Sequence, residues 1–290
     1  MRASRAVFLL AVFFTLCMPL KVNCANISER EAQRDMTDLM EAARKGDNQT
    51  IHLLLDNGAD IHARDKTGMT ALMYAALADQ SQAVQTLLAN GADMYAQDKE
   101  GRTVLMYAAV ARHSKAVQTL LDNGAAAGIH AQDNYGMTAL MAAAFNGHSK
   151  AIQALLDNGA DIHARDKYGR TALLLAAGMG RSQAIQVLLD NGADMSARDK
   201  DGRTALMRAA RDGDSQTIQT LLDNKADMHA RDDDGRTALM LAAEMGHVQA
   251  VQTLLDNGAN INTRDMNGMT ALDLARDQQH GDVVTLLERK

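Results

Sequence analysis

Nine histidines are the residues of this sequence best suited to chemistry, because histidine can ligate a metal ion or transfer protons near neutral pH. Four of them stand at the same place in the recurring motif Asp-Ile-His-Ala-Arg-Asp or a variant of it: His62, His130, His163 and His229. Zinc ligands lie about 2 Å from the ion, whereas equivalent places in neighbouring packed repeats lie about 10 Å apart. These histidines therefore cannot share one ion, and we predict no metal site.

Other catalytic signatures are absent from the sequence. It contains no H-E-x-x-H, no C-x-x-C and no phosphate-binding P-loop. Asp and His recur all along the chain, so they do not single out a Ser–His–Asp arrangement. We therefore predict a non-catalytic protein without a cofactor, and an enzyme with an unrecognised site is the least favoured alternative.

A repeat of about 33 residues organises the chain. The glycine of a G-x-T motif marks its phase at Gly68, Gly101, Gly136, Gly169, Gly202, Gly235 and Gly268. The steps between these glycines are 33, 35, 33, 33, 33 and 33 residues. A fixed period of this size indicates an array of supersecondary units, which grows without adding a second core.

The copy at Asp166–Arg198 shows the expected elements most clearly. Thr171 can cap a short Ala/Leu helix over 171–178, because its oxygen accepts from the free N–H groups of the first turn. A second helix follows over 182–191, with apolar residues at helical spacing. Gly192 ends that helix, since glycine adopts the left-handed conformation without strain. The remaining residues predict an extended turn to the next copy.

The repeated pattern G-x-T-A-L-x-x-A-A, then A-[VI]-x-x-L-L-x-x-G-A-D-[IM]-x-A-R-D, runs from Asp65 to Asp265 with little interruption. It resembles the ankyrin repeat, and the resemblance covers about residues 35–290. It implies an all-α solenoid of stacked helix-turn-helix units with β-hairpin-like fingers. The family's T-P-L-H appears here as T-A-L-M, so the hydrogen bonds of that histidine are lost. Which contacts hold each finger is therefore an open question.

We divide the chain into a signal peptide (1–24), a short polar lead-in (25–36) and an ankyrin domain (37–290). The expected repeats are 37–64, 65–97, 98–132, 133–165, 166–198, 199–231, 232–264 and 265–290. The first and last copies are more polar than the others, as an array needs where no neighbour covers it. We therefore expect both ends to be capped and the array to be complete.

The first 24 residues read as a secretory signal peptide. A basic start precedes an apolar run over 6–20, which is short for a membrane-spanning helix. We expect a periplasmic or extracellular protein on the secretory route; the alternatives are an uncleaved membrane anchor and a bacterial lipoprotein attached at Cys24. Both cysteines, Cys17 and Cys24, lie in this segment. Asn26 and Asn48 fit the N-glycosylation pattern, which matters only in a eukaryotic host.

Charge narrows the class of partner. Cleavage after Cys24 removes three basic residues and no acidic ones, which takes the net charge from −6 to −9. An acidic chain disfavours nucleic acid and anionic membrane as main partners. We expect a monomer that binds another, unidentified protein.

Two further patterns vary along the array. An Arg-Asp pair recurs before five finger tips, as at Arg64-Asp65, and another arginine follows the glycine in four repeats, as at Arg102. We expect a ladder of weak exposed ion pairs; the alternative is a basic stripe that binds carboxylates.

Asn123–His130 is two residues longer than its equivalents, and Lys225 replaces a helix-ending glycine. We expect a tolerated insertion or a binding feature at the first and strain at the second.

Specific binding should use the positions that vary between copies. In the ankyrin family these are the finger tips, the residue after the glycine and the end of the first helix. Apolar and aromatic residues at such positions cluster in repeats 2 to 5, and Tyr and Arg are enriched at interfaces. The predicted protein-binding residues are Leu77, Val110, Tyr135, Phe145, Lys167, Tyr168, Arg170, Met179 and Arg203. For Tyr74 and Tyr107, packing between helices is an equal alternative.

The leading hypothesis is thus an exported, non-catalytic scaffold that binds a protein on a preformed concave surface, with little loss of ordering entropy. The alternative is a structural accessory that stabilises one enzyme in the same compartment.

Overall fold

The computed structural model describes residues 36–111 and 114–289, which form sixteen α-helices in eight pairs. The first helices of the pairs, called inner helices, are α4 (Asp38–Lys45), α6 (Ala71–Leu77), α8 (Val104–Val110), α10 (Ala139–Asn146), α12 (Ala172–Ala177), α14 (Ala205–Asp212), α16 (Ala238–Glu244) and α18 (Ala271–Asp277). The second, or outer, helices are α5 (Asn48–Asp56), α7 (Ser81–Ala89), α9 (Lys115–Asp122), α11 (Ser149–Asp157), α13 (Ser182–Asp190), α15 (Ser215–Asp223), α17 (Val248–Asp256) and α19 (Gly281–Glu288). The predicted signal peptide and residues 25–35 of the predicted lead-in lie outside the described residues.

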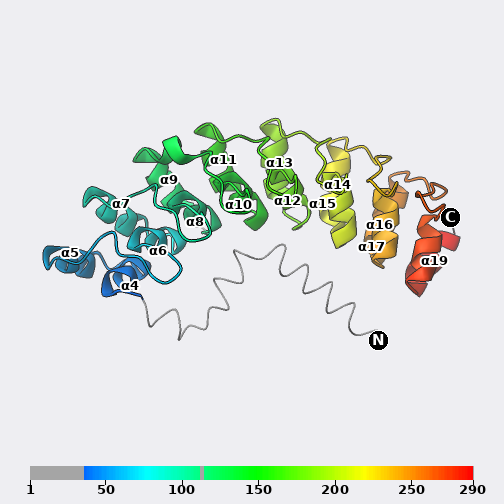
Figure 1. The fold of residues 1–290 in the computed structure, drawn as a ribbon. Coiled ribbons are helices and arrows are strands. Elements are labelled where there is room, and N and C mark those ends of the chain that lie inside the picture. Colours follow the sequence, from blue (N-terminus) through cyan, green and yellow to red (C-terminus); the bar gives the residue numbers. More distant parts are fainter. Residues whose placement is uncertain (1–35, 112–113, 290) are drawn as a thin grey trace.

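The helix pairs stack side by side into an arch (Figure 1). Inner helices pack against the inner helices of neighbouring repeats, and outer helices pack against outer helices, so the arch has two layers. From α4 to α12, the inner helices lie on the hollow side of the arch (Figure 1). The predicted all-α solenoid is confirmed.

A threonine begins every inner helix, as the sequence predicts. The Oγ1 atom of Thr171 accepts a 3.4 Å hydrogen bond from the backbone N–H of Leu174, and the other seven inner helices repeat this cap. It satisfies one of the free N–H groups of the first turn. At the end of α13, the side-chain amide of Asn191 donates to the carbonyl of Val187 at 2.8 Å, and Gly192 follows with a φ of 86°.

The core is one continuous cluster of small and flexible apolar side chains. The inner helices contribute buried alanines, which let neighbouring backbones approach closely, and buried methionines such as Met73 and Met141. Methionine adapts to irregular gaps, and this explains its frequency in a core that contains few aromatic rings. The outer helices close the cluster with residues such as Ile152 and Leu188.

An aspartate organises each finger, the turn between an outer helix and the next inner helix, and it is buried in every finger except that of Asp65. The Oδ1 atom of Asp166 accepts from the backbone N–H groups of Tyr168 and Arg170, both at 2.8 Å. The equivalent aspartates make the same pair of bonds: Asp65, Asp98, Asp133, Asp199, Asp232 and Asp265. These bonds hold the fingers in place of the lost histidine contacts. Within the described residues the fingers are turns, and one isolated antiparallel bridge joins Gln97 to Thr103.

The expected ladder of Arg-Asp ion pairs is wrong for the arginine that precedes the aspartate. Arg165 donates instead to the backbone carbonyls of Gly169 and Arg198, at 2.9 and 2.6 Å. Arg64, Arg198 and Arg231 make the same two bonds in their own repeats. Each of these arginines therefore clamps its finger to the next one, and its guanidinium serves the fold.

The two irregular segments have clear structures. In the longer connection of repeat 3, Ala125–Gly128 forms a 3-10 helix, η1. Lys225 adopts a φ of 67°, so the predicted left-handed lysine is confirmed. A side chain in this conformation brings its Cβ close to a carbonyl oxygen, which costs about 1 kcal/mol.

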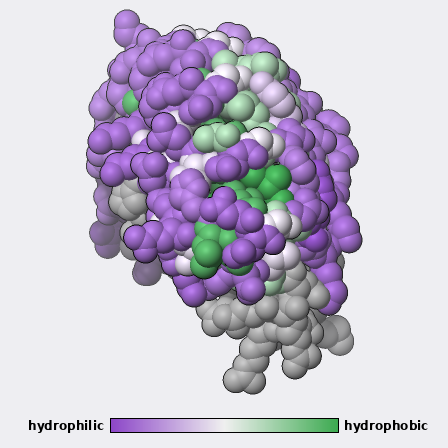
Figure 2. All heavy atoms as spheres, turned by 90° about the vertical axis from the view of Figure 1, so that its left-hand side faces the viewer, coloured by the Kyte–Doolittle hydropathy of each residue, from purple (hydrophilic) through white to green (hydrophobic). Residues whose placement is uncertain are grey.

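The first described repeat has a polar inner helix, but its outer helix exposes a large apolar side chain. On α4, Glu41 pairs with Arg44 at 2.8 Å and with Lys45 at 3.0 Å, in line with a polar cap. On α5, however, Leu53 is 61% exposed, at a position that later repeats fill mostly with threonine. Apolar side chains also reach the surface among polar ones in the view onto this end of the arch (Figure 2). The cap is therefore less polar than expected.

Candidate protein-binding surface

The last residues of the inner helices lie next to one another along the hollow side of the arch. Leu77 and Val110 occupy the same position in adjacent repeats, and both are half-buried against the core. Met179, one position further along in repeat 5, is also half-buried. Partly exposed apolar side chains on a rigid layer can bury against a partner at little entropic cost.

Two adjacent finger tips carry aromatic rings, and the backbone N–H of Lys167 joins them by donating to the carbonyl of Tyr135 at 2.9 Å. Tyr135 and Tyr168 are half-buried, and Lys167 is exposed beside Tyr168. The guanidinium carbon of Arg170 lies 4.8 Å from the centre of the Tyr168 ring, a cation–π distance. The finger of repeat 5 therefore presents the Tyr168 ring in an orientation that Arg170 stabilises.

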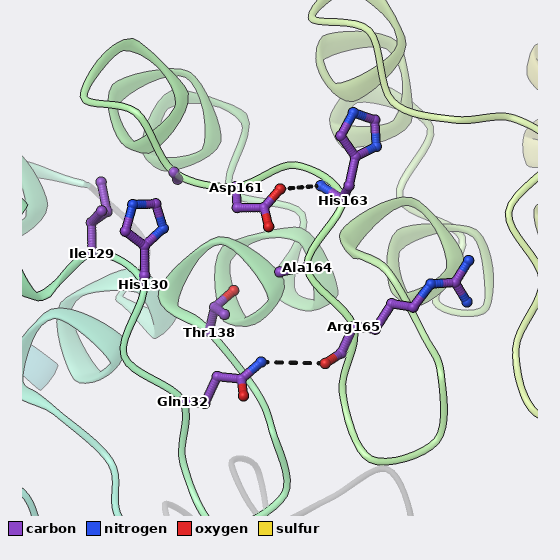
Figure 3. Close-up of a pocket in the computed structure, with 9 residues that line it drawn as sticks. Ile129, His130, Gln132, Thr138, Asp161, His163, Ala164 and Arg165 are labelled. Carbon is purple, nitrogen blue, oxygen red and sulfur yellow. Dashed lines mark hydrogen bonds between the residues drawn. The ribbon is translucent and has the colours of Figure 1, made fainter.

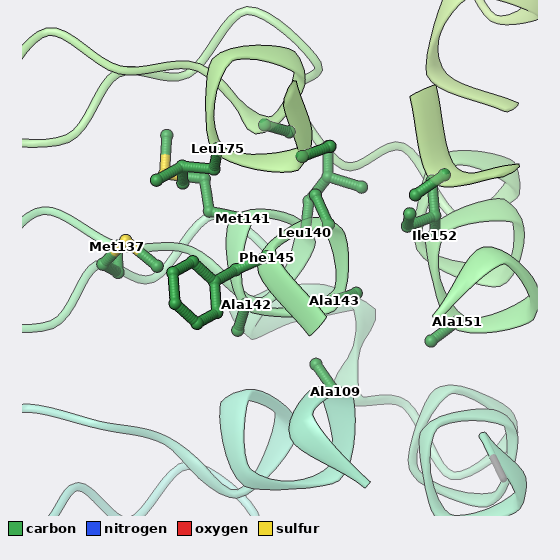
Figure 4. Packing of buried hydrophobic residues seen from close by; sticks show 14 of the residues in the cluster. Ala109, Met137, Leu140, Met141, Ala142, Ala143, Phe145, Ala151, Ile152 and Leu175 are labelled. Carbon is green, nitrogen blue, oxygen red and sulfur yellow. The ribbon is translucent and has the colours of Figure 1, made fainter. Parts of the chain in front are cut away.

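Phe145 and Arg170 are buried, so neither can contact a partner directly. The sequence-based prediction of these two residues as contact residues is therefore wrong. Phe145 is 4% exposed, and Figure 4 shows its ring within the buried cluster that includes Met137 and Ala142. Arg170 is 6% exposed, and its Nε donates to Asp166 Oδ2 at 2.6 Å. Phe145 therefore supports the inner layer, and Arg170 supports the finger of Tyr168.

Tyr74 and Tyr107, for which the sequence left two roles open, both form hydrogen bonds with finger aspartates. Tyr74 donates its hydroxyl to Asp65 at 2.7 Å, and Tyr107 donates to Asp98 at 2.5 Å. Burial, followed by the hydrogen bond to Asp65, raises the pKa of Tyr74. Tyr107 is almost fully buried, so packing between helices is its role.

Repeats 6 and 7 carry charged residues at several positions of this surface, although Met245 of repeat 7 is apolar. Arg203 pairs with Asp201 at 2.9 Å, and Arg208 pairs with Asp199 at 2.7 Å. In the next repeat, Arg236 pairs with Glu244 at 2.9 Å. Arg203, Arg208 and Arg236 are thus paired with carboxylates, so these three do not form a free basic stripe.

Arg211 and Asp212 differ from these neighbours. Neither side chain forms a hydrogen bond or an ion pair. Lost hydration, followed by repulsion from Arg203, lowers the pKa of Arg211. Lost hydration also raises the pKa of Asp212 to about 6, although part of this side chain reaches solvent. In the sequence, Arg211 and Asp212 are two adjacent opposite charges at a helix end that varies between repeats. The predicted protein-binding residues did not include them.

Three histidines in the described part of the chain contact carbonyls near the ends of inner helices. The Nε2 atoms of His148, His247 and His280 lie 2.9, 3.0 and 2.9 Å from carbonyl oxygens at the end of the inner helix in the preceding repeat, those of Val110, Arg211 and Glu244. Arg181 makes the equivalent contact with the carbonyl of Phe145 at 3.2 Å. These bonds satisfy carbonyls that the helix leaves free.

An open hollow of about 390 Å³ lies beside the longer connection of repeat 3 (Figure 3). His130 and His163 stand on opposite sides of it, and Asp161 accepts the backbone N–H of His163 at 2.8 Å. Gln132 crosses it to the carbonyl of Arg165 at 3.3 Å. Over residues 36–111 and 114–289, no three His, Cys, Asp or Glu side chains are placed to hold a metal ion.

The described part of the chain bears on a membrane-spanning helix and on glycosylation at Asn48. None of its helices combines the length and the apolar character needed to cross a bilayer. Asn48, which fits the glycosylation pattern, starts α5 half-buried, and its Oδ1 accepts from Thr86 of the next repeat at 3.3 Å. A glycan at Asn48 would break this contact.

The stacked helix pairs, capped inner helices and linked fingers define a solenoid of the helix-pair repeat class. The family model for ankyrin repeats, in three copies, matches residues 39–130, 79–166, 125–199, 163–232, 185–265 and 206–290, so the chain belongs to the ankyrin repeat family. Ankyrin repeats imply a scaffold for protein–protein interaction, and proteins of this family are generally non-catalytic. A search of the curated proteins found no match.

Proposed function

We propose that this protein is an exported scaffold that binds another protein on the hollow side of its arch, at repeats 2 to 5. The observation that supports this is the contrast between a uniform framework and a variable inner surface. Caps, finger aspartates and clamps recur with little change, whereas the ends of the inner helices and the finger tips differ between repeats. The variable positions of repeats 2 to 5 are the apolar and aromatic ones.

The proposed contact residues are those that reach the surface: Leu77, Val110, Tyr135, Lys167, Tyr168 and Met179, with Arg203 at the edge. Interfaces gain most of their affinity from a few well-packed side chains, often Tyr and Arg. Tyr168 is the strongest candidate, since Arg170 holds its ring from below. Because the surface is preformed, binding loses little ordering entropy.

A quantitative pull-down from the native compartment tests this surface. Val110→Ala and Tyr168→Ala should each weaken capture of the partner by about tenfold or more, as interface anchors do. Val248→Ala is the matched control, because Val248 is 40% exposed on the outer helix α17. If both inner variants capture the partner as well as Val248→Ala does, the surface lies elsewhere.

Export is tested separately, by N-terminal sequencing of the protein from its own cell together with the fraction in which it occurs. A mature chain that begins near Ala25 in a periplasmic, secreted or secretory fraction supports the proposal. An intact Met1 in a soluble cytosolic fraction contradicts it.

A further inference from the structure

Arg211 differs from the other arginines that the structure describes between Arg44 and Arg276, because its guanidinium is unpaired. Every other described arginine from Arg44 to Arg276 donates a hydrogen bond or forms an ion pair. Arg211 is half-buried and has no such partner for its guanidinium. A cation that loses water and gains no partner destabilises the fold, so its position calls for a reason outside the fold.

Asp212 follows Arg211 at the end of α14, carries the opposite charge and is exposed to solvent. Its carboxylate forms no hydrogen bond and no ion pair, and it does not pair with Arg211 within 4.0 Å. A Cβ added to Gly178 would lie 3.3 Å from Asp212 Oδ2 and 3.5 Å from Arg208 Nη1. The glycine of repeat 5 thus leaves bare backbone beside the charged end of α14.

The surroundings decide which ligand chemistry fits. A purely anionic partner would meet Asp212 and Asp201 as well as Arg211, so repulsion would offset its contact. A purely cationic partner would meet Arg203, Arg208 and Arg211. A partner that carries both charges side by side satisfies Arg211 and Asp212 together, and charge complementarity of this kind fixes both register and specificity.

Apolar side chains flank this pair of charges. Met179 and Met245 occupy, in repeats 5 and 7, the position that Asp212 occupies in repeat 6. Met179 is half-buried, and Met245 is 38% exposed. Methionine adapts its shape to a partner, so the surface offers a charged centre between two apolar contacts.

We propose that repeats 5 to 7 bind a protein segment that presents a carboxylate beside a cationic side chain, the carboxylate to Arg211 and the cation to Asp212. The methionines on either side contact the aliphatic parts of that segment. This inference rests on the proposed function and deepens it, since it names the chemistry of a second part of the same hollow surface.

The test uses the mature protein and three short fluorescent peptides in extended, serine-spaced designs. One alternates Glu and Lys at every second position, which places both charges on one face of a strand. The second replaces each Lys with Gln, and the third replaces each Glu with Gln. Fluorescence anisotropy measures the three affinities, and the mixed peptide should bind about tenfold more tightly than either single-charge peptide.

Variants assign each charge. Arg211→Gln should reduce binding of the mixed peptide about tenfold, to the level of the Lys-only peptide, and Asp212→Asn should reduce it to the level of the Glu-only peptide. Lys150→Gln and Asp56→Asn make the same charge changes on the outer helices α11 and α5 and should leave the affinity unchanged. Circular dichroism melting confirms that each variant is folded.

The outcomes separate this inference from the proposed function. Equal affinity for the mixed and Glu-only peptides, or equal loss in the outer-helix controls, overturns the role of the charge pair. If the peptides do not bind but Val110→Ala still releases the natural partner, this inference fails and the scaffold stands. If the peptides bind as expected while Val110→Ala releases nothing, the surface of repeats 2 to 5 fails instead.

Discussion

The guanidinium of Arg165 donates a 2.6 Å hydrogen bond to the backbone carbonyl oxygen of Arg198, which stands 33 residues further along the chain. The same nitrogen also donates to the carbonyl of Gly169 in its own finger, at 2.9 Å. One side chain therefore joins the fingers of two repeats. Repeat proteins derive much of their stability from such nearest-neighbour contacts.

Gln97 occupies the clamp position of its finger but its side chain makes no such bond. Gln97→Arg should supply hydrogen bonds to the carbonyls of Gly101 and Gln132, and it should raise the free energy of unfolding by about 0.5–1 kcal/mol. Urea unfolding measures the change. Gln249→Arg, on the exposed side of α17, adds the same charge without a carbonyl to clamp and should change little. Equal effects of the two variants would show that charge, not clamping, matters.

Lys225 ends α15 with a φ of 67°, where six other outer helices end with glycine. Lys225→Gly should relieve about 1 kcal/mol of backbone strain and lose part of it to the greater chain entropy of glycine, for a net gain of about 0.5 kcal/mol. Thermal melting should show a higher Tm.

The reciprocal variant isolates the cause. Gly192 has a φ of 86°, and no atom lies within 4 Å of an added Cβ. Gly192→Lys therefore tests backbone strain without a steric clash and should lower stability by about 1 kcal/mol. A neutral result there would remove strain as the explanation for Lys225.

The sequence predicts the helices well because the decisive interactions are local. The cap of Thr171 and the left-handed conformation of Gly192 each depend on residues within one or two turns, so the residue types alone predict them. The period then gives the stacking, since each repeat meets only its neighbours.

The candidate site was harder to predict because exposure depends on neighbouring repeats. Val110 and Phe145 hold the same repeat position, yet Phe145 is buried and Val110 is not. Arg165 looked like the partner of Asp166, but its reach to a carbonyl 33 residues away depends on how the fingers stack. Arg211 and Asp212 become distinctive only when the partners of every other arginine are known.

Arg170 and Asp166 form a buried ion pair, and breaking it on one side should be costly. Arg170→Met leaves the carboxylate of Asp166 buried without its cation, which predicts a loss of about 3 kcal/mol. Arg276→Met breaks an exposed pair with Glu288 and should cost less than about 1 kcal/mol.

The double variant Arg170→Met with Asp166→Asn separates the charge from the finger contacts. Asn keeps an oxygen for the two backbone N–H groups, so most of the lost stability should return. Urea unfolding compares the three variants. A double variant as unstable as Arg170→Met alone would mean that the packing of Arg170, and not its charge, holds the finger.

Asp212 and Glu41 should give stability profiles of opposite sign with pH. Lost hydration raises the pKa of Asp212 from 3.8 to about 6, so its contribution is most favourable below pH 3.8 and is lost as the pH rises through 6. Its partial exposure keeps the effect small. Hydrogen bonding by Arg44 lowers the pKa of Glu41 from 4.5 to about 2, so its contribution is full above pH 4.5 and is lost as the pH falls towards 2.

Two neutral variants measure these contributions against the parent protein. At pH 7, Asp212→Asn should be more stable than the parent and Glu41→Gln less stable. Both differences should vanish in acid, the first below about pH 4 and the second near pH 2. Urea unfolding across this range provides the profiles. If Asp212→Asn lowers stability at pH 7, its carboxylate has a partner in the fold, and it is then not available to a cation from outside.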